Sequence, residues 1–178
     1  MPDRMIKTEF IYAYDFVAPV GRLGFMDSGG AICGIILNCG DKDLYGVRLY
    51  NNKPYEPGVA ETPLIKAAAA QIADYLGGKR KAFDLPLKYK GVNESFTCRV
   101  LDALRAIPPG QTRSYGEIAG MCGIPKAARA VGMINKRNPI PIIIPCHRVI
   151  GFDGRLTGYA GGMEMKQHLL DLEKKYYA

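Results

Sequence analysis

The 178-residue sequence predicts an α+β protein in which a sheet-plus-helix half precedes a mostly helical half. Three observations support this prediction. Short apolar runs of strand length, separated by turn residues, fill the first fifty positions. Complete helix-capping signals first appear at Thr62, and from Ser95 onward the apolar residues recur at helical spacing. Because residues 83–93 contain proline and glycine and look like a linker, we expect two domains, 1–91 and 92–178.

Four runs in the N-terminal half predict strands, at residues 10–16, 21–26, 31–38 and 44–50. Between the second and third runs, Asp27-Ser28-Gly29-Gly30 is a strong signal for a turn that joins antiparallel strands. A well-marked helix follows, with Thr62 as N-cap and Pro63 at the first helical position. Its body runs from Leu64 to Leu76, and Gly77-Gly78 ends it. We therefore expect a sheet with a helix on one face.

Helices in the C-terminal half are predicted at residues 95–107, 114–121, 126–136 and 164–176. The second begins at a capping box, with Ser114 as N-cap and Glu117 three positions later. Pro125 starts the third after a tight turn that contains Gly123, so these two helices predict a helix-turn-helix. The last helix places an apolar stripe on one face, formed by Met165, Leu169, Leu172 and Tyr176.

Composition argues against a secreted scaffold and against a membrane protein. The longest apolar segments fall short of the roughly 20 residues that span a bilayer. Charged residues within the first ten positions argue against a secretion signal. The five cysteines are an odd number and show no paired CxxC spacing, which indicates thiols in a reducing compartment. We therefore expect an intracellular protein.

The net charge of +7 is unevenly divided, with +2 on residues 1–91 and +5 on residues 92–178. A basic half indicates a polyanionic partner, and nucleic acid is the first candidate. By itself this signal has low specificity, because many soluble proteins are basic without binding nucleic acid.

The most reactive feature of the sequence is Cys146, which lies beside His147, one of only two histidines. Because it follows the apolar run of residues 142–144, we expect it at the end of a buried strand, where neighbouring groups lower its pKa. A thiolate is a far better nucleophile than a thiol, so this arrangement predicts nucleophilic chemistry. Two alternatives remain open: an inert buried thiol, and a zinc site elsewhere with Cys33 and Cys39 as its best-placed ligands.

The second helix of the predicted helix-turn-helix is rich in small residues, with Arg129 among them: Ala127, Ala128, Ala130 and Gly132. Small side chains let a helix approach another surface closely. Against DNA this shape suits the minor groove, where Arg129 can enter the base stack. The same pattern is equally consistent with tight helix packing and Arg129 in solvent, and the basic charge of this half favours DNA.

A glycine-rich loop with one aromatic residue follows Cys146, at Gly158-Tyr159-Ala160-Gly161-Gly162. Such a loop can form a pocket wall for a flat base, because backbone approaches closely and a ring can stack. A flexible surface loop is the equally weighted alternative. On the last helix, Lys166 and Glu173 lie on a common face, from which Glu173 can reach back to orient a histidine.

Several segments together resemble one family, the O6-alkylguanine-DNA alkyltransferases (methylated-DNA–protein-cysteine methyltransferases). They lie in order between Phe96 and Glu173 and read TRSYGEIA, PKAARAVG, RNP, IPCHRVIG, LTGYAGG and K-x-x-LL-x-x-E. The resemblance implies a ribonuclease-H-like N-terminal domain and a winged helix-turn-helix-like C-terminal domain. It also implies a single-turnover DNA-repair enzyme that needs neither metal nor cofactor, and that acts as a monomer in the cytoplasm at the nucleoid. Its partner would be double-stranded DNA that contains O6-alkylguanine, and O4-alkylthymine would be a second lesion that it repairs.

The same resemblance implies the roles of five catalytic residues. Cys146 accepts the alkyl group, and His147 acts as its base through a water molecule. Glu173 holds that histidine. Tyr115 donates a hydrogen bond to the flipped guanine and protonates it as it leaves. Asn138 orders the helix-turn-helix against the active-site segment.

DNA-binding and pocket residues follow from the resemblance in the same way. Arg129 is the finger that fills the gap in the base stack. The other residues expected at DNA are Ala128, Ala130, Gly132, Ser114 and Thr112. Those expected to form the substrate pocket are Tyr159, Gly158, Ala160, Val149, Pro141 and Lys166. Met133 and Ile134 are bulkier than the family pattern on the helix that approaches DNA.

Two other functions are weighed against alkyl transfer. A non-enzymatic helix-turn-helix regulator or lesion sensor would bind DNA and use Cys146 structurally or as a redox sensor. A cysteine hydrolase would need an oxyanion hole and repeated turnover, and no feature of the sequence supports either. The mass of the protein after exposure to an alkylated substrate discriminates among the three, because only alkyl transfer leaves a single adduct on Cys146.

Overall fold

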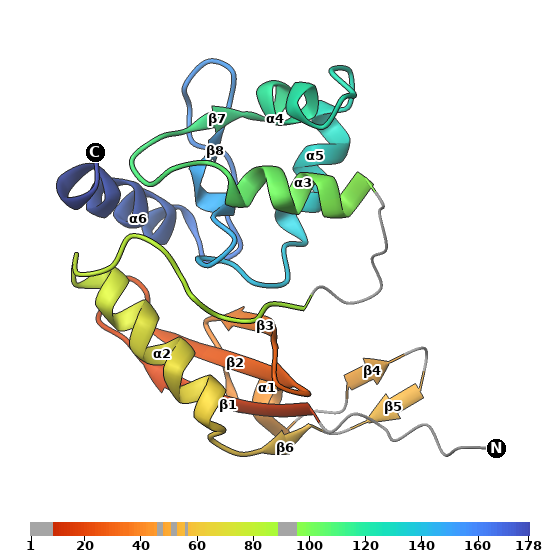
Figure 1. Cartoon of the computed structure of the whole chain (residues 1–178), viewed down its shortest axis with the longest axis vertical. Coiled ribbons are helices and arrows are strands. Elements are labelled where there is room, and N and C mark those ends of the chain that lie inside the picture. Colours follow the sequence, from red (N-terminus) through yellow and green to blue (C-terminus); the bar gives the residue numbers. More distant parts are fainter. Residues whose placement is uncertain (1–8, 46–47, 51–52, 56, 89–95) are drawn as a thin grey trace.

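The computed structural model describes residues 9–45, 48–50, 53–55, 57–88 and 96–178. It is a mixed α+β structure with two parts that share a core (Figure 1). The expected domain boundary at residues 91 and 92 lies outside the described residues. In the part of the chain that the structure describes, no helix combines the length and apolarity needed to cross a bilayer.

The N-terminal part is built on a four-stranded sheet with the strand order β3-β2-β1-β6. Strands β1 (Glu9–Asp15), β2 (Arg22–Ser28) and β3 (Ile32–Leu37) form an antiparallel meander, and the short β6 (Gly58–Val59) pairs parallel to β1. The three predicted strands therefore form within one or two residues of their expected bounds. The turn signal lies across the end of β2 and the β2–β3 connection, where Gly29 and Gly30 have φ of 65° and 84°.

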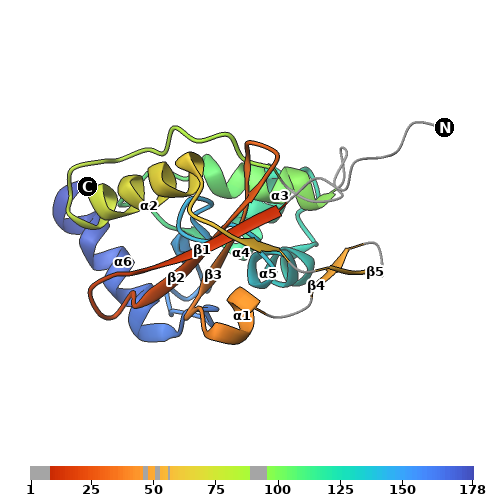
Figure 2. The same cartoon turned by 90° about the horizontal axis from the view of Figure 1, so that it is seen from below.

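The two faces of this sheet are covered by different helices (Figure 2). Helix α2 (Pro63–Leu76) packs on one face, where Phe25 and Ile35 meet Ile72 in the main core. The short helix α1 (Asp41–Tyr45) belongs to the opposite face, where a smaller cluster contains Ile11, Met26, Cys33, Cys39 and Leu44. Alternation of side chains along each strand supplies both clusters.

Helix α2 confirms its sequence signals. The Thr62 side chain accepts a hydrogen bond from the backbone N–H of Ile65 at 3.2 Å, and Pro63 occupies the first turn. The Thr62 hydroxyl also donates to Asp27 at the end of β2, at 2.8 Å, so the cap ties the helix to the sheet. At the other end Gly77 is the C-cap and Gly78 has φ of 73°.

One predicted strand is wrong at its start. Among those of residues 44–50 that the structure describes, Leu44 and Tyr45 belong to helix α1, where Leu44 is buried, and the extended part is β4 (Arg48–Tyr50). Strand β4 pairs with β5 (Lys53–Tyr55) in a separate two-stranded ribbon. Asp43 accepts a hydrogen bond from the N–H of Gly40 at 2.8 Å and caps the start of α1, a local interaction that overrides a short apolar pattern.

The C-terminal part contains helices α3 (Phe96–Arg105), α4 (Tyr115–Met121), α5 (Ala128–Lys136) and α6 (Met163–Tyr176). Between them, β7 (Arg113–Ser114) and β8 (Val149–Ile150) pair in parallel, and the one-turn helix η1 (Cys146–Arg148) precedes β8. The capping box predicted at Ser114 and Glu117 is present. Helix α5 begins at Ala128, two residues later than predicted.

The predicted stripe of α6 is buried at Met165, Leu169 and Leu172, but Tyr176 is 45% exposed. Its ring lies over Gly78, so close that a Cβ added there would be 2.7 Å from it. The final turn of α6 thus reaches past the core to the C-terminal end of α2. Gly78, which follows the end of α2, also leaves room for this ring.

The two parts of the protein share one hydrophobic core rather than a thin contact. Ile72 of α2, Leu104 of α3 and Leu169 of α6 belong to the same buried cluster. In addition, the backbone N–H of Ile35 in β3 donates to the carbonyl of Pro139 at 2.8 Å. The N-terminal sheet and α2 therefore fix the position of elements around Cys146.

We expect Thr62→Ala to lower the free energy of unfolding by about 1–2 kcal/mol, because α2 loses its N-cap and its hydrogen bond to Asp27. Denaturant unfolding followed by circular dichroism measures the change. Thr62→Ser keeps the hydroxyl and is the matched control. Equal losses in the two variants would contradict a capping role and would assign the effect to the methyl group.

Candidate active site around Cys146

Cys146 is 3% exposed and begins η1, and residues 142–145 directly before it do not form a strand. The predicted strand at residues 142–144 is wrong because the segment turns back on itself: Ile142 has φ of 72°, and Pro141 and Ile144 form an isolated bridge. Asn138 closes this turn, since its side chain donates to the carbonyl of Ile144 at 2.8 Å and accepts from the N–H of Ile140 at 3.0 Å.

The thiol of Cys146 is protonated in the resting protein. Burial raises the pKa of Cys146 to about 11, although a hydrogen bond from the Asn138 side chain and the charge of Lys166 act in the opposite direction. Neighbouring groups therefore lower this pKa as expected, but desolvation of the thiolate outweighs them and the net shift is upward. A reaction at Cys146 needs a group that removes its proton.

His147 is fully buried, and its Nε2 lies 2.9 Å from Oε1 of Glu173. Because a carboxylate accepts hydrogen bonds, Nε2 carries the proton in this tautomer and Nδ1 keeps its lone pair. Nδ1 has no hydrogen-bond partner among the residues that the structure describes. Burial lowers the pKa of His147, so the ring is neutral and able to accept a proton at Nδ1.

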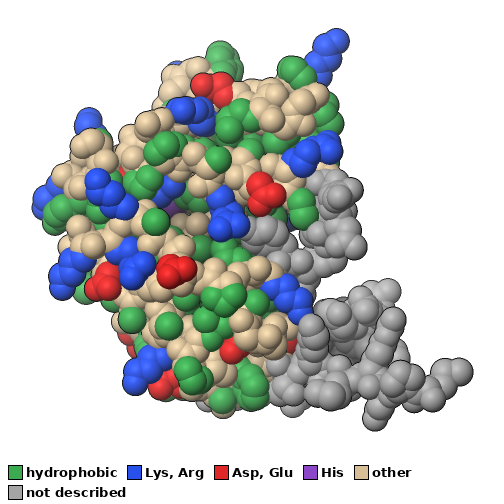
Figure 3. All heavy atoms as spheres, viewed as in Figure 1, with side chains coloured by type: hydrophobic (Ala, Val, Ile, Leu, Met, Phe, Trp, Pro, Cys, Tyr) green, Lys and Arg blue, Asp and Glu red, His purple; other side chains and the backbone are tan. Residues whose placement is uncertain are grey.

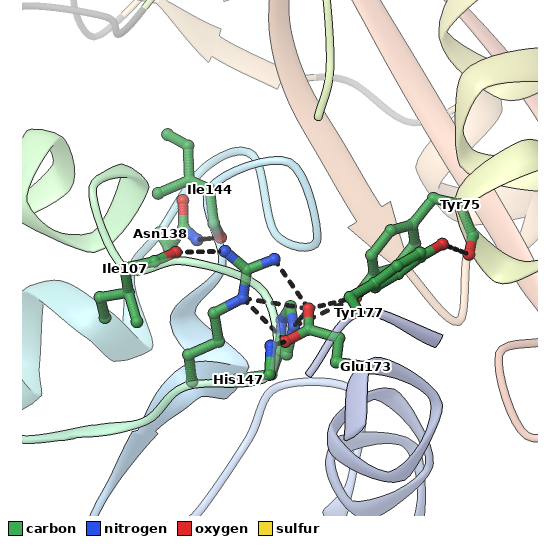
Figure 4. A network of polar contacts seen from close by, with 9 residues as sticks. Tyr75, Ile107, Asn138, Ile144, His147, Glu173 and Tyr177 are labelled. Atoms are coloured by element: carbon green, nitrogen blue, oxygen red, sulfur yellow. Dashed lines mark hydrogen bonds and ion pairs between the residues drawn. The ribbon is translucent and has the colours of Figure 1, made fainter. Parts of the chain in front are cut away.

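The Glu173 carboxylate is the centre of a buried polar network (Figure 4). Besides His147, it accepts hydrogen bonds from the Tyr75 hydroxyl at 2.5 Å, from Nη2 of Arg148 at 2.7 Å and from the N–H of Gly110 at 3.0 Å. Nε of Arg148 lies 3.0 Å from both oxygens. Despite burial, the interactions with His147 and Arg148 lower the pKa of Glu173 to about 2, so the carboxylate stays charged.

A second group of predicted residues comes from α4, β8 and α6 and includes Lys166, whose charge acts on the thiol of Cys146. Lys166 is fully buried, and its ammonium donates to the carbonyls of Val149 at 2.6 Å and Thr157 at 3.0 Å. The Tyr115 hydroxyl is 2.6 Å from the Thr157 hydroxyl. Lys166 thus holds both ends of the segment between β8 and the glycine-rich loop.

Tyr159 places its ring edge-on to His147, with centroids 6.5 Å apart. Its hydroxyl is buried and has no hydrogen-bond partner within the described ranges. Burial raises the pKa of Tyr159 well above its ordinary value, so the hydroxyl stays protonated. An unused buried donor near Cys146 can bind a polar group of a ligand. Of the other predicted pocket residues, Pro141 is buried, whereas Gly158 and Ala160 are exposed on the loop.

Helix α5 carries Arg129 on the surface, where its guanidinium forms no hydrogen bond or ion pair with any residue that the structure describes. Gly132 faces Tyr115, because a Cβ there would be 3.8 Å from the tyrosine ring. Met133 and Ile134 instead line a cavity of about 220 Å³ between α3 and α5. Lys and Arg side chains are spread over the face that contains α3 to α6 (Figure 3).

The remaining predicted DNA-binding residues lie around the start of α4 and along α5. Ser114 accepts the capping hydrogen bond from the N–H of Glu117, so its side chain is already engaged. Thr112 is half-buried just before β7. Ala128 is half-buried and Ala130 is exposed.

Four contributors to the site were not predicted from the sequence. Tyr75 comes from α2, Arg148 and Gly110 donate to Glu173, and Thr157 pairs with Tyr115. Arg148 adjoins His147 in the sequence and could have been found from that position. Nothing in the spacing around Tyr75 indicates a contact with a residue 98 positions away. Within the described ranges no group of three or more metal-ligating side chains occurs.

Comparisons with known proteins agree on one family. The model described as 6-O-methylguanine DNA methyltransferase, DNA binding domain, matches residues 95–175. A Mycolicibacterium paratuberculosis protein named methylated-DNA–protein-cysteine methyltransferase is 50% identical over 129 residues, which cover 70% of this chain and 77% of that protein. A constitutive protein of that name from Bacillus subtilis is 51% identical over 118 residues, or 66% and 70% of the two chains.

A solved structure is similar over almost the whole length. The crystal structure of Mycobacterium tuberculosis OGT in complex with DNA is matched with a TM-score of 0.75 and 39% identity, over 94% of each chain. The α+β architecture with its four-stranded sheet is therefore shared with that protein. The likeness includes the N-terminal part, in which the sequence motifs do not occur.

We expect Glu173→Gln to lower the free energy of unfolding by about 3–5 kcal/mol at pH 7, because Arg148 would keep its buried charge without its counter-ion. The folded pKa of Glu173 is depressed, so its stabilisation is present above the unfolded value of 4.5 and is lost as pH falls toward about 2. Denaturant unfolding across this range should show the difference from the wild type shrinking.

Glu164→Gln is the matched control, since it makes the same change on an exposed side chain of α6. It should leave stability nearly unchanged at every pH. A Glu173→Gln deficit that stays constant down to pH 2 would show that the carboxylate charge is not what stabilises the network.

Proposed function

This chain belongs to the family of methylated-DNA–protein-cysteine methyltransferases, and on that premise we propose that it transfers the alkyl group of O6-alkylguanine in DNA to Sγ of Cys146. O4-alkylthymine is proposed as a second lesion. One observation carries the assignment of residues: a buried thiol adjoins a neutral histidine whose Nδ1 is unoccupied and whose Nε2 is fixed by Glu173. This arrangement supports proton removal from the thiol at the moment of reaction.

The proposed step begins with transfer of the thiol proton of Cys146 to Nδ1 of His147 through a water molecule. Glu173 stabilises the imidazolium that forms, because its carboxylate is charged and 2.9 Å from Nε2. The sulfur then attacks the alkyl carbon, an S–C bond forms, and the bonding pair of the C–O bond passes to O6. The Tyr115 hydroxyl gives its proton to the departing guanine, and the proton that His147 took from the thiol replaces it by way of solvent.

The products of this step are an unmodified guanine and a thioether on Cys146. A thioether is chemically stable, so no later step returns the thiol, and each molecule reacts once. Deprotonation only in the complex is consistent with the pKa of about 11 in the resting protein. Groups near Cys146 favour the thiolate, whereas burial opposes it. Positioning of the alkyl carbon at the sulfur is a further contribution to the rate.

Burial of Cys146 supports base flipping. The sulfur of a residue that is 3% exposed cannot reach a carbon in the major groove of an intact duplex, so the damaged nucleotide must leave the stack. The unpartnered hydroxyl of Tyr159 is suited to bind the everted base, and the exposed backbone of Gly158 lets it approach. Lys166 maintains the shape of this pocket through its two carbonyl contacts.

We assign DNA binding to the helix-turn-helix of α4 and α5. The charge of +5 on residues 92–178 attracts the phosphate backbone. Small residues on α5, with the exposed Arg129 among them, fit the minor groove, and the guanidinium can fill the space that the flipped base leaves. Asn138 connects this surface to the sulfur, because it follows α5 and fixes the turn before Cys146.

The finer domain description is part of the same proposal. Residues 1–91 would form a ribonuclease-H-like domain, supported by the mixed sheet with α2 on one face. Residues 92–178 would form a winged helix-turn-helix-like domain, supported by α3 to α5 with the small β7–β8 ribbon. We expect the protein to act as a monomer.

Exposure of the protein to O6-benzylguanine should add one benzyl group, which peptide mapping by mass spectrometry places on Cys146. Cys146→Ala should bind an O6-methylguanine duplex as well as the wild type does and transfer nothing. Cys98→Ala is the control, because it removes a more accessible thiol on α3 and should keep the adduct. Lesion removal by Cys146→Ala would refute the assignment of the nucleophile.

Arg129→Ala should slow repair of O6-methylguanine in duplex DNA by at least about 10-fold, because the space in the base stack is no longer filled. Its reaction with free O6-benzylguanine should be unchanged, since no duplex has to be opened. Lys136→Ala is the matched control, because it removes another cation from the same helix. The two residues lie seven positions apart, on nearly the same face of α5 and about 10 Å apart. Equal loss on both substrates would refute a finger role.

A further inference from the structure

We propose that Tyr75, which belongs to α2 in the N-terminal part, is a positioning residue for alkyl transfer. Its hydroxyl orients the Glu173 carboxylate and, through it, the His147 ring. The inference rests on the proposed function and deepens it, because it assigns part of the reaction's geometry to the half of the chain that carries no catalytic motif.

Tyr75 reaches the site across the shared core. Its side chain is fully buried, and its hydroxyl donates to Oε1 of Glu173 at 2.5 Å. The same hydroxyl lies 3.4 Å from Nε2 of His147. It therefore contacts both groups that would handle the proton of Cys146, and Figure 4 shows the three side chains converging.

The ring of Tyr75 is held on both sides. It stacks on Tyr177 with centroids 5.9 Å apart, and it is tilted against Phe83 at 5.4 Å. The Tyr177 hydroxyl donates to the backbone carbonyl of Tyr75 at 2.7 Å. With ring and backbone both fixed, the hydroxyl has a defined position from which it can direct a carboxylate.

Packing alone does not require a tyrosine at this position. A phenylalanine would give the same contacts to Tyr177 and Phe83, and a buried hydroxyl is unfavourable unless it is hydrogen-bonded. Here the hydroxyl bonds to a charged acceptor that Arg148 and Gly110 already hold from the other side. Tyr75 thus completes the set of donors and prevents the carboxylate from turning away from His147.

The hydroxyl also adjusts how strongly Glu173 attracts a proton on His147. By sharing Oε1, it withdraws part of the negative charge from the histidine, so its removal should favour the imidazolium and raise the pKa of His147. The groups that face His147 must be considered together. Cys146 and Arg148 come from η1, and Lys166 and Glu173 come from α6. Tyr159 comes from the loop between β8 and α6.

The test uses the full-length Tyr75→Phe variant and the rate constant for its reaction with free O6-benzylguanine, measured between pH 4.5 and 8.5. We expect the rate on the plateau to fall about 3- to 10-fold, since loss of one orienting bond misplaces the base. We also expect the acid limb, where His147 gains its proton, to move to higher pH by roughly half a unit.

Tyr177→Phe is the matched control. It removes a hydroxyl from the same stacked pair, but that hydroxyl bonds to a backbone carbonyl and not to Glu173. Both variants should melt at a lower temperature than the wild type, and only Tyr75→Phe should shift the acid limb. An unshifted limb in Tyr75→Phe, or the same shift in both variants, would overturn the inference and leave Tyr75 with a packing role.

Failure of the proposed function looks different, because the wild type itself would then gain no adduct on Cys146. If Tyr75→Phe does not fold, the wild type still provides a test by nuclear magnetic resonance. A hydroxyl that donates to a buried carboxylate should give a slowly exchanging downfield proton signal, with a nuclear Overhauser effect to the Nε2 proton of His147. The absence of that signal would overturn the inference.

Discussion

The buried carboxylate of Glu173 is the interaction on which the rest of the site depends. It accepts hydrogen bonds from four residues that lie in different parts of the chain: Tyr75, Gly110, His147 and Arg148. A charge without solvent is tolerated only when such donors surround it. The network therefore joins α2, the loop after α3, η1 and α6 in one arrangement, and any shift of these elements leaves a buried charge incompletely paired.

In the proposed mechanism, this network accounts for the conversion of an unreactive thiol into a nucleophile. Burial keeps Cys146 protonated in the resting state, which limits its reaction with soluble electrophiles and oxidants. Glu173 fixes one nitrogen of His147 and leaves the other able to accept a proton. Reactivity then depends on a substrate that enters the pocket and places its carbon at the sulfur. In the proposed single-turnover reaction, this dependence keeps the thiol from being consumed before a substrate binds.

Local sequence signals succeeded where local interactions decide the structure. The capping box at Ser114 and the Thr62 cap formed as predicted, because each needs only a few consecutive residues. They failed at residues 142–144, where a strand pattern of three isoleucines occurs in a turn. There the side chain of Asn138 supplies the hydrogen bonds that a neighbouring strand would have supplied. Short apolar runs indicate burial and do not distinguish among the conformations that achieve it.

The sequence by itself determined the reactive residue types and their family, since the segment around Cys146 and the ordered motifs up to Glu173 can be identified from residue order alone. Only the tertiary structure decided the charge state of the thiol, the tautomer of His147 and the participation of Tyr75. Each of these depends on desolvation and on partners that are distant in the chain. A pKa or a hydrogen bond between α2 and α6 follows from packing, which residue spacing does not encode.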